Sequence, residues 1–129
     1  MPDVNRGNRP LSPFMLGQYY RFQLTSVTSI LTRITGNAMI VAALLIVWWF
    51  VAAATSPQAF AAADGFITSW FGDLVMALSL LGLWYHFLAG LRHLYWDTGR
   101  GLQIEVAERL GIACLVGSVV LTLLTLLVI

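Results

Sequence analysis

Apolar residues fill three long stretches of the chain, and charged residues gather at the ends of these stretches. The stretches cover residues 33–64, 73–92 and 110–129. A helix crosses the hydrocarbon core of a bilayer with about 20 apolar residues, so each stretch can span it once, the second by including its flanks. The pattern predicts an all-α integral membrane protein with three transmembrane helices. The predicted spans cover about residues 25–54, 66–96 and 108–128.

Turn-forming residues separate the predicted spans. Thr55, Ser56 and Pro57 are expected to end the first span, because proline continues a helix poorly. A short loop containing Asp64 and Gly65 then leads into the second span, and a charged loop precedes the third. Residues 1–24 are expected to form a cytoplasmic segment that ends at the membrane interface. Aromatic rings concentrate at this level, and the segment carries Phe14, Tyr19, Tyr20 and Phe22.

The composition supports the membrane class and excludes several others. Of 129 residues, 59% are hydrophobic and 10% are charged, with a mean hydropathy of +0.81, whereas soluble domains carry about a quarter charged residues. A net charge of +1 provides no basic surface for nucleic acid. The single cysteine, Cys114, excludes an intrachain disulfide, and we expect it to fill space in the third span.

The arginines predict how the chain sits in the membrane. All seven basic residues are arginines, and the loop between the first two spans contains none. The positive-inside rule therefore places the N-terminus in the cytoplasm and the C-terminus outside. The N-terminal segment has neither the apolar core of a secretory signal nor the composition of a transit peptide. We therefore expect a bacterial protein of the inner (cytoplasmic) membrane.

His86 is the first candidate for chemistry, because it lies within the second apolar stretch. It lies eleven residues before Asp97, which is about 16 Å along a helix and near the middle of the bilayer. Ionisable groups at this depth are rare and usually functional. Gly82 and Gly90 lie one turn to either side and would leave a shallow trough for a flat macrocycle. His86 is thus a candidate axial haem ligand, or else a histidine that packs between helices.

Two further groups of polar residues lie at the predicted cytoplasmic side. Ser29 and Arg33 are one turn apart and could bind the carbonyl groups of a quinone. Arg33 could alternatively contact a haem propionate or extend to the lipid headgroups. His93 and Asp97 share a face at the end of the second span, where Asp97 could orient the His93 ring for proton delivery. The alternative is a solvated helix end, to which Arg92 would also belong.

Two segments resemble a known family. The segment over residues 9–36 reads RPLSPFMLGQYYRFQLTSVTSILTRITG, and the segment over residues 86–97 reads HFLAGLRHLYWD. Both resemble the cytochrome b membrane-anchor subunit of bacterial succinate dehydrogenase (complex II), which has matching RP-SP, S-I-x-x-R and H-x-x-x-G-x-R-H-x-x-x-D motifs. The three-span plan agrees with this family as well.

The resemblance implies a set of residue roles. His86 would be the axial ligand of haem b and Arg33 a contact of its propionate. Ser29 and Arg33 would line the ubiquinone pocket, and Asp97 matches the acid of the last motif. Many relatives carry histidine where this chain has Thr32 and Phe14, so propionate binding would depend more on Arg33 and on a partner subunit.

The resemblance also implies partners. A second small membrane-anchor subunit would supply the other haem ligand, since this chain offers no second buried histidine. An iron–sulfur subunit and a flavoprotein would bind at the cytoplasmic face and hold the iron–sulfur clusters and FAD. Electrons from succinate would reach ubiquinone near Ser29 and Arg33. The alternatives are a haem-free anchor of a fumarate reductase and a small structural membrane subunit.

Overall fold

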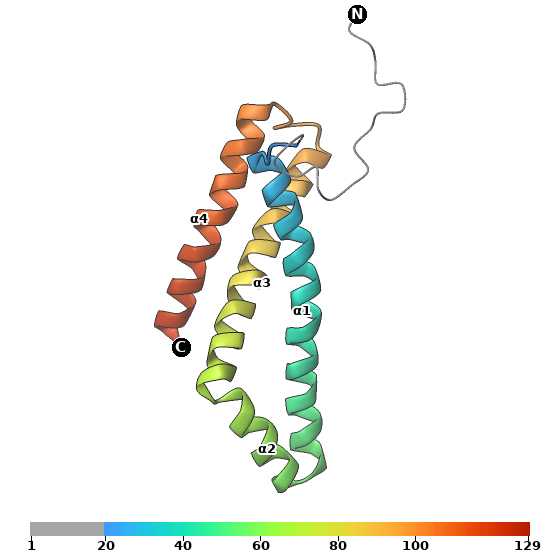
Figure 1. Cartoon of the computed structure of the whole chain (residues 1–129), viewed down its shortest axis with the longest axis vertical. Coiled ribbons are helices and arrows are strands. Elements are labelled where there is room, and N and C mark those ends of the chain that lie inside the picture. Colours follow the sequence, from blue (N-terminus) through green and yellow to red (C-terminus); the bar gives the residue numbers. More distant parts are fainter. Residues whose placement is uncertain (1–19) are drawn as a thin grey trace, which may run out of the picture.

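The computed structural model describes residues 20–129, and its regular elements are four α-helices. Three of them form an elongated bundle, and the fourth closes one end of it (Figure 1). The helices are α1 (Leu24–Thr55), α2 (Pro57–Ile67), α3 (Trp70–Asp97) and α4 (Ile104–Val128).

The three predicted spans are confirmed as α1, α3 and α4, each long and apolar enough to cross a membrane. The start of α1 is stabilised by Ser26, whose hydroxyl accepts from the Gln23 amide at 3.1 Å and donates to the Gln23 carbonyl at 2.8 Å. Such bonds satisfy groups that a helix start leaves unpaired. The predicted interfacial segment over residues 1–24 lies mostly outside the described residues.

The connection after α1 differs from the predicted loop, because residues 57–67 form α2. The Ser56 hydroxyl accepts from the Ala59 amide at 3.1 Å, and Pro57 occupies the first helical position. Both features favour a helix start, so Pro57 ends one helix and begins another. The indole of Trp49 in α1 donates to the Asp64 carboxylate at 3.1 Å and ties α2 to α1. The second predicted span starts near Phe66, whereas α3 begins at Trp70 because residues up to Ile67 belong to α2.

A small core lies where α3 passes between α1 and α4. Tyr85 and Ala89 of α3 pack with Cys114 of α4, and partly buried leucines surround them. The expected filling role of Cys114 is confirmed by its 6% exposure. Most large apolar side chains of the three spans instead face outward. Exposed apolar area on this scale marks a surface that lipid or other protein covers.

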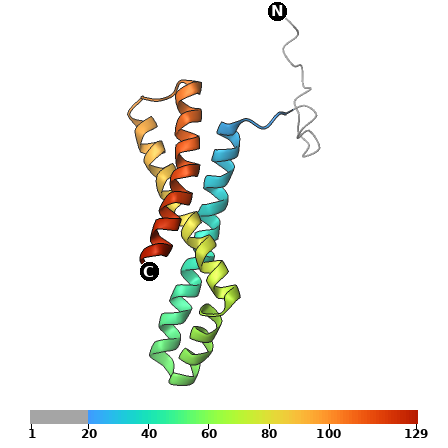
Figure 2. The ribbon, with the colours of Figure 1, turned by 90° about the vertical axis from the view of Figure 1, so that its left-hand side faces the viewer.

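Both views place the start of α1 and the α3–α4 connection at the same end of the bundle, with α2 at the other end (Figures 1 and 2). Arg21 precedes α1, while Arg100 and Arg109 lie in and just after the connection. The fold therefore gathers these three arginines at one end. This arrangement agrees with the orientation predicted from the positive-inside rule.

Candidate functional site

The His86 side chain is half-buried on α3 and turns one ring nitrogen toward α1. Its Nδ1 lies 3.1 Å from the backbone carbonyl oxygen of Thr32 and 3.3 Å from the hydroxyl oxygen of Thr35. A carbonyl oxygen only accepts hydrogen bonds, so Nδ1 carries the ring proton. In the neutral ring, Nε2 is then the nitrogen with a free lone pair.

The second ring nitrogen of His86 is not fully enclosed by the residues that the structure describes. Both hydrogen bonds of this ring use Nδ1. Within residues 20–129, the enclosed side-chain nitrogens that lack a partner are Nε and Nη1 of Arg92, and Nε2 of His86 is not among them. The ring thus combines a fixed tautomer with an accessible lone pair. A histidine that ligates a metal commonly shows this arrangement, in which its other nitrogen donates to a carbonyl.

Gly36 makes room for the His86 ring, and sequence reasoning missed it. A Cβ at position 36 would lie 3.1 Å from Cε1 of His86 and 3.6 Å from Nδ1, so a larger residue would press on the ring. The glycines predicted to form a trough have different surroundings. A Cβ at Gly82 would approach Thr35 at 3.8 Å, whereas one at Gly90 would meet nothing within 4 Å. Of these two glycines, Gly90 faces open space, whereas Gly82 faces the Thr35 side chain.

Ser29 and Arg33 lie on the same side of α1 as the His86 ring. Positions 29, 33 and 36 follow the i, i+4, i+7 spacing that places residues on one helix face, and the ring contacts this face at Gly36. Ser29 is half-buried and Arg33 is exposed. The fold therefore places Ser29 and Arg33 on the face of α1 that carries Gly36, which the His86 ring contacts.

Thr32 takes part through its backbone rather than its side chain. Its hydroxyl donates to the Thr28 carbonyl at 2.8 Å, while its own carbonyl accepts from His86. No cationic group therefore stands at this position. Phe14, the other departure from the family pattern, lies outside the described residues.

The structure corrects the expectation that Asp97 orients the His93 ring. Nδ1 of His93 donates to the Ala89 carbonyl of its own helix at 2.7 Å, and the ring packs edge-on against Trp96. Both His93 and Asp97 are exposed. A local backbone acceptor thus orients the ring, which keeps His93 at the surface beside Asp97 without a bond between them.

Arg92 was expected at a solvated helix end, and this was wrong. It is only 4% exposed, with its guanidinium 4.7 Å from the centre of the Trp96 ring. A Cβ at Gly111 of α4 would lie 3.5 Å from Nη1 of Arg92, so the glycine provides space for the cation. Residues 86 and 92 are six apart, which places their side chains roughly 120° apart around the helix axis. Arg92 therefore packs into the bundle, away from the face of His86.

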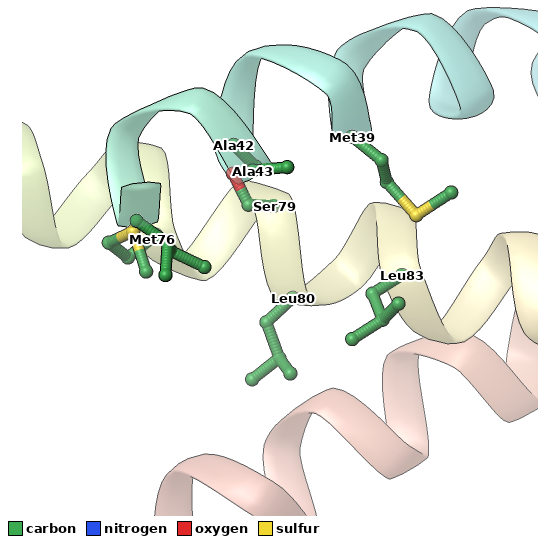
Figure 3. A pocket seen from close by; sticks show the side chains of 8 residues that line it. Met39, Ala42, Ala43, Met76, Ser79, Leu80 and Leu83 are labelled. Carbon is green, nitrogen blue, oxygen red and sulfur yellow. The ribbon is translucent and has the colours of Figure 1, made fainter. Parts of the chain in front are cut away.

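Two apolar hollows lie between α1 and α3 on the side nearer α2. One has a volume of about 360 Å³ and is lined by side chains such as Met39, Met76 and Leu83 (Figure 3). The Ser79 hydroxyl within it donates to the Val75 carbonyl at 2.7 Å, so it is not free for a ligand. The other, of about 320 Å³, reaches Gly82, one turn from His86. Such walls suit hydrocarbon, whereas orienting a polar headgroup requires the groups around Arg33 and His86.

The sequence points to His86, Ser29 and Arg33 as candidates but not to the groups that hold the His86 ring. Thr35 and Gly36 lie two and three residues after Arg33 in the sequence. Two small residues opposite an intramembrane histidine are a usable signal, because small residues allow close helix contacts. The backbone carbonyl of Thr32 leaves no sequence signal at all.

Comparison with known proteins identifies the family of the chain. Residues 5–125 match the family described as succinate dehydrogenase/fumarate reductase transmembrane subunit. The chain is 56% identical over 128 residues to the succinate dehydrogenase cytochrome b556 subunit of Paracoccus denitrificans, covering 99% of this chain and 97% of that protein. It is 37% identical to the cytochrome b560 subunit of Reclinomonas americana, covering 76% and 70%, and 34% identical to the cytochrome b556 subunit of Rickettsia conorii, covering 90% and 89%. The chain therefore belongs to the family of succinate dehydrogenase/fumarate reductase transmembrane subunits, and it is a multi-pass membrane subunit of an oxidoreductase complex.

Proposed function

We propose that this chain anchors a bacterial succinate dehydrogenase in the inner membrane, supplies one axial ligand of haem b and forms part of the ubiquinone pocket. The observation that carries the proposal is the hydrogen-bonding state of His86. Its Nδ1 donates to the Thr32 carbonyl at 3.1 Å, which leaves Nε2 as a metal ligand on the accessible side of the ring. The relatives named cytochrome b subunits support haem b as the group that this nitrogen holds.

The residues around His86 fit a flat macrocycle. Gly36 lets the ring lie close to α1, and the open space at Gly90 leaves room beside the ring on α3. Arg33, on the same face of α1 as Gly36, is proposed to contact a propionate, since a guanidinium pairs well with a carboxylate. Haem supplies one-electron redox chemistry when it is bound. The protein contributes the ligand, its orientation and an apolar environment.

Ser29 and Arg33 are proposed to bind the headgroup of ubiquinone. A hydroxyl and a guanidinium both donate hydrogen bonds, which the carbonyl oxygens of a quinone accept. Both residues lie within the first three turns of α1, at the end of the bundle where the arginines gather. A headgroup there would meet polar groups while its apolar tail stayed in lipid.

The remaining parts of the reaction are assigned to partner subunits. We propose that a second membrane-anchor subunit supplies the other axial ligand, because this chain has only two histidines and His93 is exposed at the helix end. An iron–sulfur subunit and a flavoprotein carrying FAD would bind at the cytoplasmic end and deliver electrons from succinate. The chain itself would contribute no dehydrogenase site.

His93 and Asp97 are proposed to carry protons toward the quinone. Both are exposed near the end of α3, and their side chains accept and release protons readily. His93→Gln and Asp97→Asn should therefore alter the rate and pH profile of quinone reduction. Both variants should leave intact the succinate–dye activity, in which a dye replaces quinone as the electron acceptor. Unchanged profiles in both variants would remove the pair from the reaction.

The axial role is tested by His86→Ala in the assembled complex, with His93→Ala as a matched control of the same residue type. We expect His86→Ala to lose haem or to change its absorption spectrum, measured relative to bound flavin. The His93→Ala variant should retain the haem signal. An unaltered spectrum in His86→Ala would refute the assignment. A purified complex that contains flavin and iron–sulfur clusters but no haem would instead support the haem-free anchor of a fumarate reductase.

A further inference from the structure

We propose that Thr35 is a positioning residue for His86, because its hydroxyl oxygen accepts a second hydrogen bond from Nδ1 and thereby increases electron donation by Nε2. The inference deepens the proposed function, since it assumes that His86 ligates haem iron. It concerns a residue that lies on a different helix and does not touch the metal itself.

The direction of the Thr35 hydrogen bond follows from its neighbours. The Thr35 hydroxyl has one proton, and it donates this proton to the Leu31 carbonyl at 2.8 Å. Its oxygen therefore faces Nδ1 of His86, at 3.3 Å, as an acceptor. Nδ1 already donates to the Thr32 carbonyl at 3.1 Å. One N–H thus lies between two acceptors from successive turns of α1, and such three-centre bonds are common in proteins.

Contacts with neighbouring residues hold this arrangement in place. A Cβ at Gly36 would approach Cε1 of His86 at 3.1 Å, so the ring packs closely against α1. The Thr35 methyl group packs toward Gly82, at 3.8 Å from where a Cβ would stand there. Both helices thereby restrict the Thr35 side chain, with its oxygen toward the ring and its methyl group toward α3. A fixed acceptor holds the imidazole in one rotation and one tautomer.

The chemical consequence concerns the haem potential. Acceptors on the N–H of a ligating imidazole raise the basicity of its other nitrogen, and such second-shell bonds are one way a protein tunes a haem. A more basic ligand favours the ferric state over the ferrous state. Removing the Thr35 acceptor should therefore raise the midpoint potential of the haem.

The test uses the assembled complex with Thr35→Val, which keeps the shape of the side chain and removes the hydroxyl. Thr32→Val is the matched control, because the Thr32 hydroxyl donates to the Thr28 carbonyl and does not touch His86. Redox titration of the haem absorbance should show a higher midpoint potential in Thr35→Val only. Thr35→Ser, which retains the hydroxyl, should restore the original value.

Each outcome separates this inference from the proposed function. Equal potentials in Thr35→Val, Thr32→Val and the unaltered complex would overturn the role of Thr35, even if His86→Ala loses haem. Haem that persists in His86→Ala would overturn the axial assignment itself. If Thr35→Val prevents assembly, Thr35→Ala and Thr35→Ser replace it as the pair. Serine must then keep the original potential and alanine must raise it, and equal potentials would overturn the inference.

Discussion

The two histidines of α3 differ in what their Nδ1 atoms bind, although they lie only seven residues apart. His86 donates to the carbonyl of another helix, at Thr32, whereas His93 donates to Ala89 of its own helix. A bond to another helix fixes a ring relative to the whole bundle, and a bond within the helix fixes it only locally. This difference supports the proposed roles, with His86 as a cofactor ligand and His93 as a proton carrier.

Gly36 offers a direct test of the ring's position. Gly36→Ala would place a methyl group 3.1 Å from Cε1 of His86, so the ring must move away from α1. Overpacking of this kind costs about 1–3 kcal/mol, which corresponds to roughly 5- to 150-fold weaker haem retention. The ratio of haem to flavin in the purified complex measures the effect. Gly65→Ala, where a Cβ meets nothing within 4 Å, is the control and should retain haem.

The role of Arg33 in quinone binding can be tested by comparing succinate oxidation with quinone and with a dye as the electron acceptor. Arg33→Leu removes the guanidinium proposed to bind the quinone. Hydrogen bonds to charged groups contribute about 1.5–3 kcal/mol, so we expect succinate–quinone activity to fall roughly 10- to 150-fold. Succinate–dye activity should change little, because dyes accept electrons elsewhere. Equal losses in both assays would indicate general instability of the complex rather than a damaged quinone pocket.

At the scale of the helices, the sequence is misleading over α2 and the corner that follows it, where a loop was expected. Pro57 and Asp64–Gly65 favour a loop by composition, yet Ser56 caps a helix that Pro57 can begin. Ser69 caps the next helix by accepting from the Gly72 amide at 3.1 Å. Local capping groups thus allowed a helix where turn residues predicted a loop.

Gly72 is the residue on which this corner depends. A Cβ there would overlap the backbone carbonyls of Phe66 and Ile67, which cannot move without displacing α2. We expect Gly72→Ala to destabilise the complex by about 1–3 kcal/mol or more, as a lower midpoint of thermal unfolding. Gly65→Ala within α2 gains up to about 1 kcal/mol of helix propensity without a clash. Equal midpoints of thermal unfolding in the Gly72→Ala and Gly65→Ala complexes would contradict the close contact between position 72 and the carbonyls of α2.

At the scale of the whole molecule, the bundle buries few of its own residues and presents an apolar surface. The arginine-bearing end and the α2 end lie at opposite ends of the bundle (Figure 1). Lipid and other subunits of the complex can cover the apolar sides. The bundle therefore acts as one component of a larger complex.

The orientation of the bundle can be measured with epitope tags. Because the loop without basic residues should face outward, a tag after Ile129 should be accessible to protease in spheroplasts. A tag before Met1 should be cleaved only in inverted vesicles. Gln58→Cys, at an exposed position of α2, should react with an impermeant maleimide in spheroplasts. The reverse pattern would place the proposed quinone residues on the outer side.

The sequence by itself determined the number of spans, their approximate positions and the depth of His86, because these depend on hydrophobic length alone. It also marked Ser29 and Arg33 by their motif. Only the tertiary structure decided that Arg92 is buried, that α2 is a helix and that Thr32, Thr35 and Gly36 surround His86. These features depend on which faces of α1 and α3 meet and on one backbone carbonyl. Hydrophobic patterning does not encode that register, because all sides of a membrane helix are apolar.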